Sequence, residues 1–387
     1  MRLLFMTQIA LDIEKSSRIH MIEFSENFKK IGNEVLMIGP TYQRNRKNKY
    51  NFNLRQLYLI RQNLISDMVY ALISPFLLVY YKLTFKADII YCRGVSRTAI
   101  IPICKLLNFK VVIEINGIIE DELKERNYNK YIISLVKSIN KMNCRLADRI
   151  IVVTGGLKKR LIADFNINKN KIFVVNNGAN INMFQPLDKN YCRKMLNLTN
   201  DFYVGFVGSF QPWHGIDKLI FAASFLKQSG YKRIKFLLVG NGNLTDKQRL
   251  IHLIKKMAVE EFFIFAGEIE YSKVPIYINS FDICVAPFTS VRNNSIGLSP
   301  LKVFEYLSCG KPVIISKINE ISEIIQKNNC GYIFNPDDTN DLVNRIIYAY
   351  NEKEKLNRFG RNGRALVVNQ YSWNENAGKI QTILNSL

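Results

Sequence analysis

A cation and a carboxylate lie three residues apart in the segment Gly297–Val313, GLSPLKVFEYLSCGKPV. The pattern predicts a short loop, a helix and a buried strand, so Lys302 and Glu305 share one face of the helix. Backbone N–H groups of the loop around Ser299 would stand at the helix start, where phosphate binds well. Lys302 could then neutralise a diphosphate and Glu305 could bind sugar hydroxyls, which together suit a nucleotide-sugar. An amphipathic helix with a surface ion pair explains the same residues.

A second loop has the glycines that a phosphate-binding turn requires. Gly208 follows an apolar run, and Gly215 opens the next helical stretch. Glycines at both ends of such a loop let a diphosphate approach backbone amides at a helix start. Ser209 is neutral and His214 is charged only when protonated, so neither replaces a permanent cation. A packed or capping role for His214 is an equal alternative.

Length and composition predict two domains and a reducing, cytoplasmic environment. The chain has 387 residues, more than one typical domain, and 48% of them are hydrophobic. The seven Cys residues form no C-x-x-C pair and several lie in apolar runs, which is typical of buried free thiols. The three His residues are far apart in sequence, and we therefore expect no zinc site.

The N-terminal half has features of a protein that binds a membrane surface. Residues 1–185 contain 29 Lys and Arg against 14 Asp and Glu, a net +15 of the total +22. The longest apolar run, Met68–Tyr81, is shorter than the ~20 residues that a spanning helix needs and predicts a buried or interfacial helix. We therefore expect an anionic membrane as a partner and, since no nucleic-acid-binding motif occurs, no nucleic acid. A core helix bent at Pro75 is the alternative.

Short β-rich runs alternate with helical stretches along the chain, which predicts parallel sheets covered by helices on both faces. The opening run, MRLLFMTQIA, reads as a first strand and not as a signal peptide. The strands predicted before the turn-rich segment 176–186 are Leu3–Thr7, Glu34–Gly39, Asp88–Cys92, Lys110–Ile115, Arg149–Val153 and Lys171–Val175. Those predicted after it are Phe202–Val207, Ile234–Val239, Phe262–Ala266, Asp282–Ala286, Pro312–Ile315 and Gly331–Phe334.

The order and spacing of several motifs resemble glycosyltransferase family 4 over nearly the whole chain. These motifs are Ala147–Thr154 with Lys171–Pro186, Val204–Asp217, Leu238–Gly242, Phe265–Pro287 and Gly297–Val313. The resemblance implies the GT-B fold, with two Rossmann-like, doubly wound α/β domains that face a central cleft. We expect an acceptor-binding domain at residues 1–180, a nucleotide-sugar-binding domain at 187–370, and a helix at 371–387 that packs back on the first domain.

The resemblance also assigns donor contacts in the second domain. Ser209 and His214 stand where many relatives carry Arg and Lys, and Gly297 stands where they carry the first of two Glu. The remaining Glu305 should bind the ribose hydroxyls. The sequence Ser-Pro-x-Lys before it resembles a subgroup associated with bacterial surface polysaccharides. The predicted donor-binding residues are Gly208, Ser209, His214, Gly240, Gly267, Ser299, Leu301, Lys302 and Glu305.

In the first domain the predicted catalytic residues are Asn116 and Glu120. Asn116 stands where many relatives carry His, and it can orient a hydroxyl but cannot act as a base at neutral pH. Glu120 is better suited to contact the acceptor, with a solvated acidic helix start as the alternative. His20 and Arg93 are the predicted acceptor-binding residues, with a structural His and a surface Arg as alternatives.

The resemblance implies a retaining glycosyltransferase that is peripheral on the cytoplasmic face of the membrane. It would move a sugar from a nucleoside diphosphate sugar to a lipid-linked, lipopolysaccharide or capsule glycan. Catalysis would rest on stabilising the leaving diphosphate and on positioning. We expect no metal, since no Asp-x-Asp occurs, and no other cofactor. A nucleotide-sugar epimerase of the same fold and a non-catalytic basic protein that binds glycan or nucleic acid are the alternatives.

Overall fold

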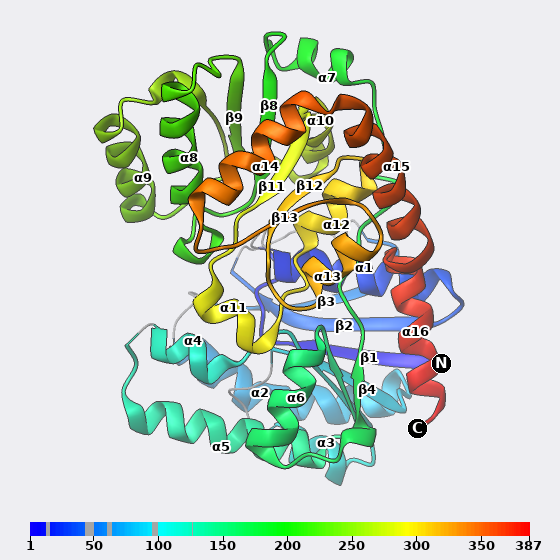
Figure 1. Cartoon of the computed structure of the whole chain (residues 1–387). Helices are drawn as coiled ribbons and strands as arrows, with labels where there is room; N and C mark the ends of the chain where they lie inside the picture. The colour runs from blue at the N-terminus through cyan, green and yellow to red at the C-terminus, as the bar shows by residue number, and fades with distance from the viewer. Residues whose placement is uncertain (13–15, 43–49, 60–63, 95–99, 126) are drawn as a thin grey trace. The chain divides into compact units, whose positions relative to one another are not determined.

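The chain folds into two compact units. A computed structural model describes residues 1–12, 16–42, 50–59, 64–94, 100–125 and 127–387. Unit 1 comprises Met1–Asn176 and Trp373–Leu387, and unit 2 comprises Asn177–Ser372. The last helix of the chain therefore belongs to unit 1 (Figure 1). The assignment of acceptor and donor binding to these two parts of the chain stays a prediction.

Unit 1 is built on a parallel sheet. Among its described residues the sheet has seven strands in the order β3-β2-β1-β4-β5-β6-β7. The strand order reverses between β1 and β4, and ligands of such sheets bind beyond the carboxyl ends of the strands at this point. The strands are β1 (Arg2–Thr7), β2 (Glu34–Thr41), β3 (Asn53–Tyr58), β4 (Ile89–Arg93), β5 (Lys110–Ile115), β6 (Arg149–Val152) and β7 (Ile172–Val174).

Helices on both faces of this sheet bury its apolar side chains. Phe24 of the first helix is buried and stacks on Tyr91 of β4, and the last helix of the chain adds Ile380 and Leu384 to the same core. The helices are α1 (Ser16–Lys30), α2 (Leu64–Thr84), α3 (Ile100–Leu106), α4 (Ile119–Glu125), α5 (Lys130–Leu146), α6 (Gly155–Phe165) and α16 (Trp373–Asn385).

The apolar run Met68–Tyr81 lies within α2, which continues through Pro75. Tyr70 and Leu78 are buried, whereas Leu72 and Phe76 are 69% and 77% exposed. The interpretation of a plain core helix is therefore wrong, because one face of α2 packs on the unit and the other is open and apolar. Within the described part of the chain, no helix combines the length and the hydropathy needed to cross a membrane.

Unit 2 repeats the same architecture. Its parallel sheet has six strands in the order β10-β9-β8-β11-β12-β13, all within the described residues. The order reverses between β8 and β11, which places the switch point at the loops that follow these two strands. The strands are β8 (Phe202–Val207), β9 (Ile234–Val239), β10 (Phe263–Gly267), β11 (Ile283–Ala286), β12 (Val313–Ser316) and β13 (Gly331–Phe334).

Unit 2 has an apolar core on each face of its sheet, because successive side chains of a strand point to opposite faces. Val204 and Phe206 enter one core and Tyr203 of the same strand enters the other. The seven Cys side chains of the chain are free and buried. The helices are α7 (Lys189–Met195), α8 (Ile216–Gln228), α9 (Leu244–Lys256), α10 (Val274–Ser280), α11 (Ser290–Ile296), α12 (Leu301–Ser308), α13 (Ile321–Lys327), α14 (Thr339–Asn351) and α15 (Lys353–Gln370).

Candidate functional site

The loops after β8 and β11 meet at the switch point of unit 2. The loop after β8 passes through a short 3-10 turn, Pro212–His214, and reaches α8 at Gly215. Gly215 has φ +65°, and a Cβ there would lie 1.9 Å from the carbonyl oxygen of Pro287, just after β11. No described side chain caps the N-terminus of α8. Its first N–H groups therefore face this junction without a side-chain acceptor.

Three predicted glycines join the ends of β8, β9 and β10. The N–H of Gly208 donates to Val239 O at 2.9 Å, and the N–H of Gly240 donates to Gly267 O at 2.7 Å. A Cβ on Gly240 would lie 2.1 Å from Gly208 O. Gly208 and Gly240 thus use their N–H groups inside the protein. These glycines would therefore contribute to a donor site by letting the backbones of the two loops pack closely, and not by donating N–H groups to phosphate.

Lys302, in the first turn of α12, places its ammonium under this loop. Its Nζ lies 4.0 Å from the ring centroid of Phe206 and 5.6 Å from that of Phe288. The Nζ is buried, and none of the described residues accepts a hydrogen bond from it. Burial lowers the pKa of Lys302 to about 7, although the nearby Glu305 carboxylate acts in the opposite direction. The site is therefore a desolvated amine whose charged form a bound anion would stabilise.

Glu305 lies one turn further along α12 and is also buried, with 6% of its surface exposed. Its Oε1 accepts a hydrogen bond from the Tyr271 hydroxyl at 2.7 Å. The interpretation of Lys302 and Glu305 as a surface ion pair is therefore wrong. The neighbouring Tyr306 hydroxyl accepts a hydrogen bond from Val207 N–H at 2.7 Å, which fixes α12 to the end of β8.

The loop before α12 offers fewer N–H groups than the sequence led us to expect. Gly297 N–H donates to Asn293 O at 2.9 Å, and Pro300, the N-cap residue, has no N–H. The buried Ser299 hydroxyl accepts a hydrogen bond from Asn177 N–H at 2.8 Å. No described side chain caps α12. Backbone contacts to an anion would therefore come from the first turn of α12, which begins at Leu301.

Ser209 and His214 lie on opposite ends of the loop after β8. Ser209 is exposed, and His214 Nδ1 donates to its carbonyl oxygen. The His214 ring also lies edge-on to Phe288, with 5.8 Å between the ring centroids. A neutral His214 therefore carries its proton on Nδ1, and only Nε2 could meet a ligand.

In unit 1 the predicted acceptor residues surround a buried carboxylate. Glu114 of β5 accepts hydrogen bonds from Arg93 Nη1 at 3.0 Å and from the Tyr91 hydroxyl at 2.7 Å. His20 Nε2 lies 2.8 Å from the same carboxylate. Burial would raise the pKa of Glu114, but Arg93, His20 and these hydrogen bonds outweigh it and lower the pKa to about 2.

The hydrogen bonds around Glu114 change the interpretation of Arg93 and His20. Arg93 is 6% exposed, so the alternative of a surface Arg is wrong. His20 is also 6% exposed, and its ring lies edge-on to Trp373 of α16, with 4.8 Å between the centroids. Both side chains contact Glu114 in this structure, and their contact with an acceptor stays a prediction.

The two predicted catalytic residues differ in their surroundings. Asn116 is exposed in the turn after β5. Glu120 of α4 is 4% exposed, so the alternative of a solvated helix start is wrong for this residue. Sequence reasoning did not identify Tyr271, Phe206 or Phe288 as part of the site, because an aromatic side chain is also expected in the core and nothing local shows that it faces α12. Among the described residues, no group of three or more His, Cys, Asp or Glu side chains could hold a metal ion.

Two family models together match most of the chain. Residues 188–366 match the group 1 glycosyl transferases and residues 18–182 match glycosyltransferase family 4. The chain belongs to the group 1 and family 4 glycosyltransferases. The predicted family is thereby confirmed, and its members are transferases.

Individual relatives of this glycosyltransferase chain are distant. D-inositol 3-phosphate glycosyltransferase 2 of Catenulispora acidiphila is 25% identical over 224 residues, which cover 56% of this chain and 51% of the relative. The capsular polysaccharide biosynthesis glycosyltransferase CapM of Staphylococcus aureus is 25% identical over 274 residues, 67% of each chain. The chain spans about half the length of the first curated relatives that it matches.

Solved structures show the fold of this family member. Sucrose-phosphate synthase from Thermosynechococcus elongatus has a TM-score of 0.80 and 18% identity, with 100% of this chain and 99% of that chain covered. Anabaena HepE in complex with UDP-glucose has a TM-score of 0.77 and 16% identity, with both chains fully covered. The predicted GT-B fold of two Rossmann-like units is confirmed.

Proposed function

We propose that the chain is a retaining glycosyltransferase that binds a nucleoside diphosphate sugar at the β8–β11 switch point of unit 2. One observation carries the proposal most directly: the buried Lys302 ammonium, for which none of the described residues accepts a hydrogen bond. A diphosphate supplies the missing acceptors and negative charge. The uncapped N-termini of α8 and α12 add oriented N–H groups at the same place.

Each donor residue has a distinct proposed role. Lys302 and the helix N-termini stabilise the charge that develops on the leaving diphosphate, which is how such sites lower the barrier without a covalent nucleophile. Glu305, held by Tyr271, binds the ribose hydroxyls. Asn116 orients a hydroxyl of the reacting sugars. The complex of HepE with UDP-glucose, a distant structural relative, supports this choice of donor class. We propose that the transfer needs neither a metal nor another cofactor.

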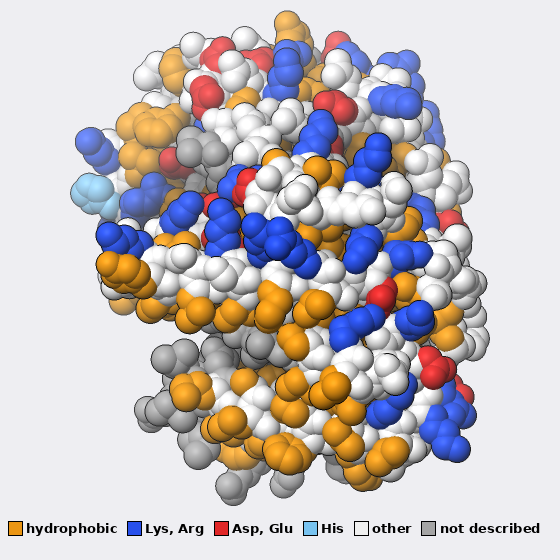
Figure 2. Space-filling model, turned by 90° about the horizontal axis from the view of Figure 1, so that it is seen from below, with side chains coloured by type: hydrophobic (Ala, Val, Ile, Leu, Met, Phe, Trp, Pro, Cys, Tyr) orange, Lys and Arg blue, Asp and Glu red, His pale blue; other side chains and the backbone are white. Residues whose placement is uncertain are grey.

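We further propose a lipid-linked or cell-surface glycan as the acceptor, reached at the cytoplasmic face of the membrane. The name of the distant relative CapM, a capsular polysaccharide enzyme, supports this acceptor class. Hydrophobic side chains cover much of the face of the molecule on the side of α3 and α5, with Lys and Arg beside them (Figure 2). A surface of this composition suits anionic lipid.

The apolar part of that proposed membrane surface is continuous in structure, because α2 packs on α3 and α3 packs on α5. Its most exposed members are Leu72, Phe76 and Leu83 of α2, Leu106 of α3, and Tyr131 and Leu135 of α5. Exposed basic residues on the same elements or next to them are Lys86, Lys110, Lys130 and Arg145.

Calorimetry with nucleoside diphosphates tests the donor half of the proposal. UDP, GDP and ADP are titrated into the protein and into Glu305→Ala, with the exposed Glu354→Ala as a matched control. We expect one nucleotide to bind, and Glu305→Ala to weaken it at least tenfold, since hydrogen bonds to a charged group contribute about 1.5–3 kcal/mol each. Unchanged affinity in Glu305→Ala would contradict the assigned site. Transfer from a panel of nucleotide-sugars, followed by NMR of the product anomer, tests the reaction and its retention.

A further inference from the structure

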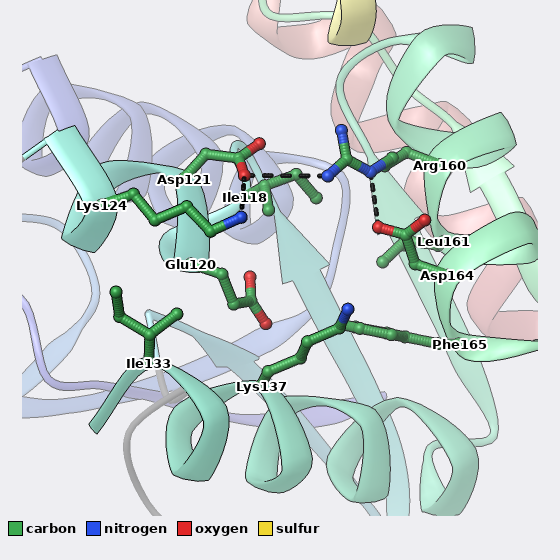
Figure 3. Close-up of a pocket in the computed structure, with 10 residues that line it drawn as sticks. All are labelled: Ile118, Glu120, Asp121, Lys124, Ile133, Lys137, Arg160, Leu161, Asp164 and Phe165. Atoms are coloured by element: carbon green, nitrogen blue, oxygen red, sulfur yellow. Dashed lines mark hydrogen bonds and ion pairs between the residues drawn. The ribbon is translucent and has the colours of Figure 1, made fainter. Parts of the chain in front are cut away.

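A cavity of about 40 Å³ lies inside unit 1 between α4, α5 and α6, and the donor site does not account for it. Ile118, Leu161 and Phe165 form apolar walls, and charged side chains from all three helices surround the opening (Figure 3). The volume holds a few water-sized groups. A hydroxyl or hydroxymethyl group can therefore enter, whereas a whole sugar ring must stay at the opening.

Glu120 supplies the polar end of this cavity. The residue is 4% exposed, and its Oε2 is buried without a hydrogen-bond donor among the described residues. Among the described residues, the hydrogen bond that its Oε1 accepts is a long one, 3.4 Å from Asn140 Nδ2. A buried carboxylate oxygen that accepts no hydrogen bond costs free energy, so the arrangement favours a ligand that donates a hydrogen bond to it. Figure 3 shows the carboxylate pointing into the space between the helices.

The charges at the opening are not all neutralised. Arg160 is held by Asp164 at 2.5 Å and by Asp121 at 3.7 Å, and Lys124 lies 3.9 Å from Asp121. Lys137 of α5 also lines the cavity and is exposed, but no described carboxylate lies within ion-pair distance of it. The acceptor inside and the cation at the opening, which no described carboxylate pairs, suit a ligand with a hydrogen-bond donor at one end and an anion at the other.

We propose that this cavity binds a phosphorylated sugar or polyol, with a hydroxyl donated to Glu120 Oε2 and the phosphate on Lys137. The inference rests on the proposed function in one respect, because the bound group would then be the phosphorylated end of the acceptor. A neutral sugar would leave Lys137 without an anion. Inorganic phosphate would bring its own negative charge against the Glu120 carboxylate, or would stay on Lys137 and leave Glu120 Oε2 without a donor.

Binding measurements with defined probes test the site. Glucose 1-phosphate, glucose and inorganic phosphate are titrated into the protein, Glu120→Gln, Lys137→Gln and the control Lys141→Gln, which removes a charge from the same helix at a residue that does not line the cavity. We expect glucose 1-phosphate to bind at least tenfold more tightly than either fragment. Either cavity variant should weaken its binding at least fivefold, and Lys141→Gln should not. Equal binding by the protein and both cavity variants would overturn the proposal, as would the absence of binding.

Two further measurements show which kind of sugar phosphate binds and whether the donor site is intact. The affinity for glucose linked to farnesyl diphosphate is compared with the affinity for glucose 1-phosphate. Tighter binding of the first identifies a lipid-linked ligand, and tighter binding of the second identifies a free sugar phosphate. If Glu120→Gln does not fold, Glu120→Asp replaces it, because the shorter side chain keeps the charge and withdraws it from the cavity. The affinities for UDP, GDP and ADP are measured on the same samples. Absence of nucleotide binding in every protein would contradict the proposed function, whereas normal nucleotide binding without glucose 1-phosphate binding by the unmodified protein would contradict this inference.

Discussion

The ammonium of Lys302 lies against the backbone of Gly208: a Cβ at position 208 would stand 2.6 Å from Lys302 Nζ. The two residues are far apart in sequence but meet where the strand order of unit 2 reverses. Gly208 therefore provides the space in which the cation of α12 reaches the loop after β8. This contact connects the glycine loop and the donor helix, which the sequence presents as separate motifs.

Gly208→Ala should weaken nucleotide binding because the new methyl group displaces Lys302. Gly208 also has φ +138°, so the substitution strains the backbone. Gly230→Ala is the matched control, because Gly230 has φ +80° and no atom within 4 Å of its Cβ position. We expect both variants to lose about 1 kcal/mol of unfolding free energy, and only Gly208→Ala to lose tenfold or more in nucleotide affinity. Calorimetry and thermal unfolding check this, and equal affinities in the two variants would contradict it.

Nucleotide binding should take up a proton above pH 7. Burial lowers the pKa of Lys302 to about 7, and a bound diphosphate would raise it again. Because the folded pKa is below its usual value of 10.5, the charged form is disfavoured in the folded state, and stability should rise between about pH 7 and pH 10.5. Calorimetry at pH 8 in buffers of different ionisation enthalpy measures the uptake. We expect an uptake of up to one proton per bound nucleotide for the unmodified protein. The uptake should be smaller for Lys302→Met, in which His214 is the remaining group at the site that could take up a proton.

The alternation of strands and helices predicted most of the fold. Phe202–Val207, Ile234–Val239 and Gly331–Phe334 were predicted at the observed bounds, because each is a short apolar run between turn residues. The strand Asn53–Tyr58 was missed. It lies at the edge of its sheet with half-exposed side chains, so its sequence, NLRQLY, has no continuous apolar signal.

The site was predictable in its motifs but not in its environments. The spacing of Lys302 and Glu305 placed them on one helix, yet burial decides their chemistry and depends on Phe206 and Tyr271, which are distant in sequence. The same holds for Arg93. Its local sequence is also that of a surface residue, and only the pairing of β4 with β5 places it beside the buried Glu114. Long-range packing therefore determines which charged residues are solvated.

Glu114→Gln should destabilise unit 1 strongly at neutral pH. The substitution leaves the buried Arg93 without its carboxylate, a loss that typically costs 3–5 kcal/mol. The pKa of Glu114 is lowered to about 2, so its stabilising effect is present above its usual pKa near 4.5 and is lost as the pH falls toward 2. Urea unfolding at pH 7 and pH 3 should show a smaller difference between protein and variant at pH 3.

The exposed ion pair of Glu34 with Arg2 provides the control for this prediction. Glu34→Gln should change the unfolding free energy by less than about 1 kcal/mol at either pH, because surface pairs are weak. A Glu114→Gln variant as stable as Glu34→Gln would mean that Arg93 finds other partners and that the buried network is not structural.

The membrane surface can be tested on α2 alone. Leu72 and Phe76 are 69% and 77% exposed and lie one turn apart. Replacing both with Ser should weaken binding to vesicles that contain anionic lipid by tenfold or more, since burying one such side chain contributes about 1.5–3 kcal/mol. Leu244→Ser, at a residue of unit 2 that is 72% exposed, is the control and should bind like the unmodified protein.

Salt and lipid charge separate the two contributions to this binding. The unmodified protein should float with anionic vesicles, float less with neutral ones, and partly detach in high salt, because basic residues near the surface each contribute about 1 kcal/mol that salt screens. The double Ser variant should keep its nucleotide affinity, since α2 belongs to unit 1 and the proposed donor site to unit 2. Flotation that is independent of lipid charge and unchanged in the double variant would contradict membrane binding and favour a soluble acceptor.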